Sequence, residues 1–238
     1  MIGTIPEEIG SISTIKSLNF FSNGLNGSLP ARLGNLPLTF LDIESNSFSG
    51  ILFTENFLML ADTLVKLRAS RNTFSGTIPN RISDFTLLQE FWIGDNEFNG
   101  IIPDSISALV NLDSLILRRN KFEGSIPDSI GLLLSLEQIL LDTNMLDGEI
   151  PTSLANLKNL QLMTLNNNTL VGEIPPGFKD LINLERFRAF DNKLVGKIPV
   201  LEQMTNLSKL INYFEHLFQL LISLTEHFFD STSFNSAS

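Results

Sequence analysis

An asparagine followed four residues later by a glycine recurs along the chain and sets the period of its structure. The glycines lie 23 to 26 residues apart, and the last five spacings are all 24. The pattern begins with Asn23 and Gly27 and ends with Asn192 and Gly196. Self-similarity at such a period predicts a stack of like structural units. Function is therefore expected on a surface that many units share.

The repeated asparagine is best explained as a structural ladder. Turns between stacked units remove backbone N–H and C=O groups from water, and an Asn amide can both donate and accept hydrogen bonds there. Because buried polar groups need partners, we expect these side chains to hold the turns together. The ladder positions are Asn23, Asn46, Asn72, Asn96, Asn120, Asn144, Asn168 and Asn192. Two residues further on, a column beginning with Phe48, Phe74, Phe98 and Phe122 is expected to lie in the core.

Each unit reads L-x-x-L-x-L-x-x-N-x-L-x-G-x-I-P. One unit comprises Leu112, Leu115, Leu117, Asn120, Phe122, Gly124, Ile126 and Pro127. The L-x-L step has strand periodicity, so its two apolar side chains point inward and the residue between them points outward. Stacking then predicts a parallel sheet, and the N-x-x-x-G stretch is expected to turn the chain away from it. No single unit can bury its own apolar side chains, so stability is distributed along the array.

With its G-x-I-P signature the array resembles the plant-type leucine-rich-repeat class. This class includes the ectodomains of receptor-like kinases and receptor-like proteins and the secreted polygalacturonase inhibitors. The Ile-Pro or Leu-Pro step places prolines at Pro6, Pro30, Pro79, Pro103, Pro127, Pro151, Pro175 and Pro199, and the unit after Gly50 lacks one. The resemblance implies an α/β fold, a curved horseshoe with a parallel β-sheet on its concave side and 3-10 or short helices and turns on its convex side. It covers residues 1–206, about eight full repeats with partial ends.

The two ends of the chain depart from this pattern. Apolar residues recur with helical spacing after Leu207, which predicts an amphipathic helix over residues 207–229 that covers the last repeat as a C-terminal cap. A helix for a membrane surface or a partner is the alternative, and residues 230–238 are expected to be disordered. The apolar run is shorter than the ~20 residues of a membrane span. Met1 starts in the middle of a unit without a signal-peptide pattern, so we expect a fragment of a longer receptor.

Composition argues against several classes of function. The formal charge of -10 and the pI of about 4.6 disfavour nucleic acid as a partner, because phosphate binding needs clustered Lys and Arg. The chain has no cysteine, and its two histidines, His216 and His227, do not have metal-ligand spacing. No phosphate loop, nucleophile elbow or kinase signature occurs. We therefore expect no enzymatic activity, no cofactor and no metal.

The outward positions of the strands give the candidate binding surface. The central outward column is Asn19, Asp42, Arg68, Trp92, Ile116, Leu140, Thr164 and Arg188. Trp92, Ile116 and Leu140 are adjacent in it and are expected to form an apolar stripe exposed to water. Cross-strand packing alone is the alternative explanation for these bulky residues. The candidate ligand-binding residues are Arg68, Trp92, Ile116, Arg118, Leu140, Thr164, Arg188 and Phe190.

Charged residues and glycosylation motifs flank this column. Asp95 is expected to lie between Arg71 and Arg119, and Arg118 beside Asp142, in pairs that are mainly structural. Arg68 is positioned to stack on the indole of Trp92. Three N-x-[ST] motifs make Asn26, Asn167 and Asn206 candidate glycosylation sites if the protein is secreted.

These observations favour a non-enzymatic module that recognises a protein or peptide on the exposed strand face. The resemblance implies a receptor at the cell surface or outside the cell, acting in signalling or defence, with a second leucine-rich-repeat ectodomain as a further candidate partner. The compartment stays open, because the sequence shows neither a signal peptide nor a transmembrane helix. Two alternatives remain: an inhibitor of secreted polysaccharide-degrading enzymes, and a truncated receptor fragment without independent function.

Overall fold

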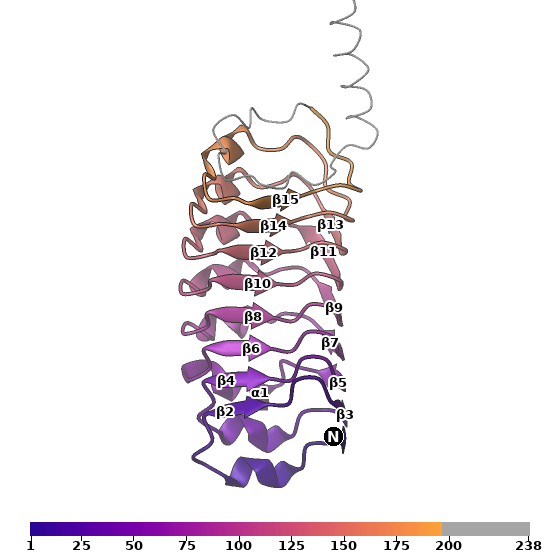
Figure 1. Cartoon of the computed structure of the whole chain (residues 1–238), viewed down its shortest axis with the longest axis vertical. Helices are drawn as coiled ribbons and strands as arrows, with labels where there is room; N and C mark the ends of the chain where they lie inside the picture. Colours follow the sequence, from indigo (N-terminus) through magenta and orange to yellow (C-terminus); the bar gives the residue numbers. More distant parts are fainter. Residues whose placement is uncertain (197–238) are drawn as a thin grey trace, which may run out of the picture.

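The computed structural model describes residues 1–196 as a solenoid of stacked coils (Figure 1). Most coils contribute one strand to each of two parallel sheets and one short helix between them. The chain thus forms the parallel-strand solenoid with short helices that the repeat predicts. The predictions of an amphipathic helix over residues 207–229, of a disordered tail over residues 230–238 and of a glycosylation site at Asn206 fall outside the described residues.

The eight-stranded sheet is built from the L-x-L steps and runs along the front of the solenoid in Figure 1. Its strands are β2 (Ser17–Asn19), β4 (Phe40–Asp42), β6 (Lys66–Arg68), β8 (Glu90–Trp92), β10 (Ser114–Ile116), β12 (Gln138–Leu140), β14 (Leu162–Thr164) and β15 (Arg186–Arg188). Neighbouring strands are parallel and pair without a register shift, so equivalent residues of successive coils lie side by side.

A second parallel sheet is formed by the stretches between the ladder asparagine and the Ile-Pro step. Its strands are β1 (Ile2–Gly3), β3 (Gly24–Gly27), β5 (Ser47–Ile51), β7 (Thr73–Gly76), β9 (Glu97–Gly100), β11 (Lys121–Ser125) and β13 (Met145–Asp147). The expectation that this stretch only turns the chain away was therefore incomplete. The repeated glycine four residues after each ladder asparagine has a positive φ value, so the chain pairs with its neighbours before it bends toward the helix.

Short helices form the side opposite the seven-stranded sheet. They are η1 (Glu7–Ser11), η2 (Ala31–Asn35), α1 (Glu55–Leu58), η3 (Met59–Asp62), η4 (Asn80–Asp84), η5 (Asp104–Ala108), η6 (Asp128–Leu132), η7 (Thr152–Asn156) and η8 (Pro176–Asp180). Except for α1 and η3, each is a 3-10 helix that follows an extended proline. In the coil that lacks proline, Thr54 caps α1 by accepting the N–H of Phe57 at 3.3 Å.

The core is a continuous set of apolar columns between the sheets and the helices. The phenylalanines of the predicted column are fully buried, and they stack in pairs with centroids 6.1 Å apart for Phe48 and Phe74 and 6.3 Å apart for Phe98 and Phe122. Phe53 of the irregular coil adds an aromatic contact with Phe91. No helix among the described residues is long and apolar enough to cross a membrane.

Candidate functional site

The central outward column lies in register along the eight-stranded sheet. Trp92 pairs with Arg68 on one side and Ile116 on the other, and Ile116 pairs in turn with Leu140. Thr164 and Arg188 continue the same row. We call the outward side of this sheet the sheet face. Its strands are about 4.8 Å apart, so the row is a regular series of side chains.

The apolar stripe is much less exposed than the sequence predicts. Leu140 is only 7 % exposed and Thr164 only 5 %, whereas Trp92 and Ile116 are half-buried. Leu140 is shielded because Ile116 and Thr164 lie beside it on the two paired strands. The prediction of a fully exposed stripe is therefore wrong at Leu140. Of the three residues of the predicted stripe, only Trp92 and Ile116 present apolar surface to solvent.

Trp92 is held in place from two directions. The guanidinium carbon of Arg68 lies 4.3 Å from the centroid of the Trp92 ring, which is a cation–π contact. The indole nitrogen of Trp92 donates a hydrogen bond of 2.8 Å to the Ser114 hydroxyl on the next strand. The ring is thus fixed while part of it stays accessible.

Arg68 in turn belongs to a compact charged network on the sheet face. Its Nε donates to one carboxylate oxygen of Glu90 at 2.6 Å, and Lys66 reaches the other oxygen at 2.5 Å. Burial alone would raise the pKa of Glu90, but the two hydrogen bonds outweigh burial and lower it. Asp42 lies 3.9 Å from Arg68, and burial raises the pKa of its carboxyl. Arg68 is consequently committed to residues of its own sheet.

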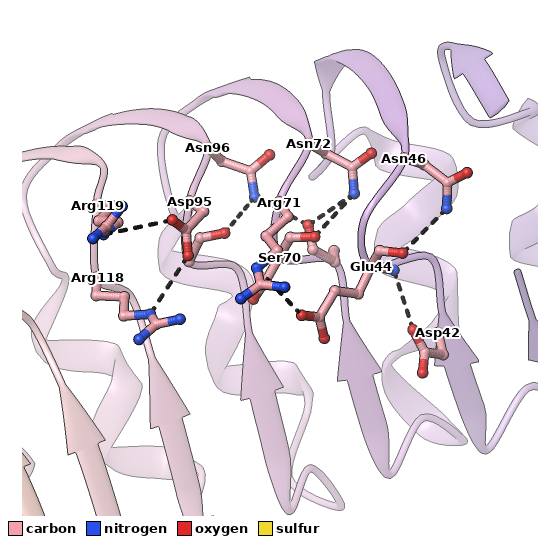
Figure 2. A network of polar contacts seen from close by, with 12 residues as sticks. Asp42, Glu44, Asn46, Ser70, Arg71, Asn72, Asp95, Asn96, Arg118 and Arg119 are labelled. Atoms are coloured by element: carbon pink, nitrogen blue, oxygen red, sulfur yellow. Dashed lines mark hydrogen bonds and ion pairs between the residues drawn. The ribbon is translucent and has the colours of Figure 1, made fainter. Parts of the chain in front are cut away.

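A second polar network runs along the turns that follow the strands (Figure 2). Arg118 and Arg119 both approach Asp95, at 3.5 and 3.7 Å, and Arg71 lies 4.0 Å from Glu44. The predicted pairing of Arg118 with Asp142 is wrong.

The partner of Asp142 is Thr164, whose hydroxyl donates to its carboxylate at 2.5 Å. Gly94 explains why Arg118 pairs elsewhere. Because Gly94 has no side chain, the stem of Arg118 can lie across it toward Asp95, with Cγ only 3.2 Å from where a Cβ would be.

The ladder asparagines bridge neighbouring coils through backbone groups. Asn96 donates to the carbonyl oxygens of Ala69, Ile93 and Gly94 and accepts the N–H of Phe74 at 3.0 Å. The same pattern recurs at Asn46, Asn72, Asn120, Asn144, Asn168 and Asn192. At the edge of the stack, Asn23 accepts from the amino group of Met1 instead. The side-chain amides of the ladder asparagines are therefore used in hydrogen bonds that stabilise the fold.

A second polar ladder, which sequence reasoning missed, lies at the corner after the helices. Asn111, Asn159 and Asn183 each donate to a backbone carbonyl of the preceding coil at 2.8 to 3.0 Å, and Ser135 does so at 3.3 Å. The signal was present in the sequence as an asparagine in the L-x-N-L step of several units. The residues of this second ladder therefore have a structural role, because they connect each coil to the one before it.

The remaining candidate residues are spread along the sheet face and its margins. Arg188 is half-buried and forms no ion pair with any residue of the described range, and Phe190 is half-buried rather than fully exposed. Asn26 and Asn167 are both exposed, Asn26 on β3 and Asn167 in the turn before Asn168. Among residues 1–196 no group of His, Cys, Asp and Glu side chains is placed to hold a metal ion.

Two parallel sheets, an asparagine ladder that bridges neighbouring coils and helices after Ile-Pro are the features of a leucine-rich-repeat solenoid. Comparison with known proteins agrees. The sequence model of the Leucine Rich Repeat family matches residues 87–109, 111–133 and 159–181. MDIS1-interacting receptor like kinase 1 of Arabidopsis thaliana is 35 % identical over 89 residues, which is 37 % of this chain and 8 % of that protein.

Solved structures extend the similarity to most of the chain. The plant peptide hormone receptor RGFR1 in complex with RGF2 is 36 % identical with a TM-score of 0.81, over 87 % of this chain and 32 % of the receptor chain. The Arabidopsis receptor kinase HAESA in complex with the peptide hormone IDA and the co-receptor SERK1 is 34 % identical with a TM-score of 0.68, over 83 % and 37 %. This chain thus spans about a third of the length of these receptor chains. It carries leucine-rich repeats and is similar to plant receptor ectodomains.

Proposed function

We propose that this chain is the recognition part of a receptor-type protein and holds a peptide or protein segment against the sheet face. The observation that carries the proposal is Trp92, the only tryptophan in the sequence. It lies half-buried in a regular sheet and is fixed by Arg68 and Ser114. A rigid aromatic ring that is partly open to solvent suits a binding hot spot, because little freedom is lost when a ligand packs on it.

Charge on the sheet face supports a ligand that extends from Trp92 toward β15. Around Trp92 the basic side chains are already paired with Glu90, Asp42 and Asp95. Arg188, four strands away in the same row, is free of ion pairs within the described range and suits an anionic group of the ligand. At about 4.8 Å per strand the two sites are roughly 19 Å apart, about the span of six extended residues.

The relatives support the same class of ligand. RGFR1 is a plant peptide hormone receptor solved in complex with RGF2, and HAESA was solved in complex with the peptide hormone IDA and the co-receptor SERK1. We extend to this chain a peptide ligand and assembly with a second receptor chain. The inhibitor alternative relied on an acidic docking surface. On the outward strand positions of the sheet face, basic side chains outnumber acidic ones, so we do not propose that function. The basic ones are Lys66, Arg68, Arg186 and Arg188, and the acidic ones are Asp42 and Glu90.

The test uses a phage-displayed library of random twelve-residue peptides, selected on the immobilised chain. Affinities of the enriched peptides are then measured by calorimetry with Trp92→Ala, Arg188→Ala and the control Thr77→Ala. Thr77 is exposed and directly follows β7 of the seven-stranded sheet. Both sheet-face variants should bind at least ~10-fold more weakly, the loss typical of a hot-spot truncation, and the control should bind normally. Peptides that bind all variants equally, or a library without binders, would overturn the proposal.

A further inference from the structure

Four large apolar side chains form an exposed patch on the helical side of the solenoid. Leu87 is 44 % exposed, Val110 56 %, Leu132 63 % and Leu134 58 %. They lie at or just after the ends of η4, η5 and η6, three helices that contact one another in sequence. We call these four residues the corner patch. Contiguous exposed apolar groups of this kind mark interaction surfaces, because they have a solubility cost.

The repeat itself does not require these residues. Leu87 occupies the position at which Asn111, Asn159 and Asn183 donate to the preceding coil. Leu132 stands where the coils on either side have Asp84, Ala108 and Asn156. Val110 and Leu134 occupy equivalent positions in successive coils. The equivalent residue is Thr86 in the preceding coil and Lys158 in the following coil. Apolar character is thus concentrated in three consecutive coils, at positions where flanking coils are mostly polar.

The charges at the two ends of the patch indicate what covers it. On the η4 side lies Asp84, whose only ion pair among the described residues is a surface one with Arg81 at 3.0 Å. On the η7 side lies Lys158, which is exposed, makes no ion pair within residues 1–196 and has its Nζ 3.4 Å from the Asp180 carbonyl oxygen. The patch therefore carries a carboxylate at one end and an ammonium at the other.

We propose that the corner patch is the interface of a two-fold symmetric dimer of this chain. A two-fold axis perpendicular to the solenoid axis, between the coils of Val110 and Leu134, aligns two solenoids in opposite directions. Val110 then faces the partner's Leu134, and Lys158 comes within reach of the partner's Asp84. In this arrangement the corner patch of one copy covers the apolar residues of the other, and each charged end meets the opposite charge. This proposal is independent of the peptide ligand on the sheet face.

Sedimentation velocity of the full chain between about 1 and about 500 µM tests the dimer. We expect a concentration-dependent dimer whose dissociation constant rises at least ~10-fold in Leu134→Asp, since a charge would be buried at the centre of the interface. Ile101→Asp is the matched control, because Ile101 is 61 % exposed and directly follows β9 of the seven-stranded sheet. Circular dichroism of both variants should match that of the unaltered chain.

Charge reversal tests the symmetry. Asp84→Lys and Lys158→Asp should each weaken the dimer severalfold at low salt, and the double variant should restore it, because the exchanged charges meet again across the axis. A chain that is monomeric at every concentration overturns the proposal, and so does a dimer broken by Ile101→Asp but not by Leu134→Asp. A double variant no tighter than the single ones overturns the two-fold arrangement. Trp92→Ala should leave the dissociation constant unchanged.

Discussion

The guanidinium of Arg68 lies 4.3 Å from the ring centroid of Trp92 and at the same time donates to Glu90, two residues before Trp92 on the same strand. The position of the proposed binding anchor therefore depends on a buried carboxylate that no ligand needs to touch. Glu90 is 7 % exposed, so its charge is tolerated only because Lys66 and Arg68 accompany it. Binding and stability are coupled through this network.

Removing the Glu90 charge should lower stability in a pH-dependent manner. In Glu90→Gln, Lys66 and Arg68 lose their anionic partner, and we expect a loss of ~1 to 3 kcal/mol in the free energy of unfolding at pH 7. The pKa of Glu90 lies below its usual 4.5 in the folded chain. Its stabilising contribution is therefore complete above pH 4.5 and disappears as the pH falls through the lowered pKa.

Urea unfolding of both proteins between about pH 3 and about pH 7 measures this difference. The difference in free energy of unfolding between the unaltered chain and Glu90→Gln should be constant near neutral pH and should disappear at the acidic end of the range. Glu123→Gln is the control and should show no such gap, because Glu123 is exposed and forms no ion pair within residues 1–196. A gap that widens toward low pH contradicts the expected sign.

Asp113 should show the opposite behaviour. Burial raises the pKa of its carboxyl, and the neighbouring charges of Glu90 and Glu137 add to the effect. An acid with a raised pKa destabilises the fold above that pKa, and the penalty vanishes as the pH falls below the unfolded value of 3.8. Asp113→Asn should therefore raise the free energy of unfolding by roughly 0.5 to 1 kcal/mol at pH 7 and leave it unchanged near pH 3. Parallel pH-dependent urea curves for the two proteins would disprove this assignment.

The sequence was sufficient to predict the solenoid, because its signals are local and repeated. The L-x-L step, the ladder Asn and the Ile-Pro step each specify one part of a coil, and stacking aligns like parts. The outward row from Arg68 to Arg188 followed from strand alternation alone. The contact of Arg68 with Trp92 also followed, since the two occupy the same position on neighbouring strands.

Features that depend on side-chain shape could not be read in this way. The shielding of Leu140 arises from the sizes of Ile116 and Thr164 beside it. The pairing of Arg118 with Asp95 depends on the missing side chain of Gly94, which lets the arginine stem lie across the sheet. The strand register gives each side chain possible partners on both neighbouring strands, and side-chain packing determines which partner it contacts.

Deleting one rung of the ladder should destabilise the solenoid. Asn96→Ala leaves the N–H of Phe74 without its acceptor. It also removes one of the donors to each of three carbonyl oxygens, those of Ala69, Ile93 and Gly94. Thermal unfolding should report a loss of ~1 to 3 kcal/mol, the cost of unpaired buried polar groups. Asn99→Ala is the matched control, because Asn99 is exposed on β9 three residues away. Equal effects of the two substitutions would show that the ladder bonds are not the cause.

The residue before each ladder asparagine offers a route to stabilisation. At this position every coil adopts a left-handed backbone conformation, which Thr143 enters with φ of 58° and Asn167 with φ of 56°. The conformation is costly for a β-branched residue, whereas asparagine tolerates it. Thr143→Asn should therefore raise the free energy of unfolding by roughly 0.5 to 1 kcal/mol, even though the 3.4 Å hydrogen bond from Asn167 to the threonine hydroxyl is lost. Thr143→Val removes the hydroxyl but keeps the branching, so it should give no gain in urea unfolding. A gain in the valine variant equal to that in the asparagine variant would rule out backbone strain as the reason.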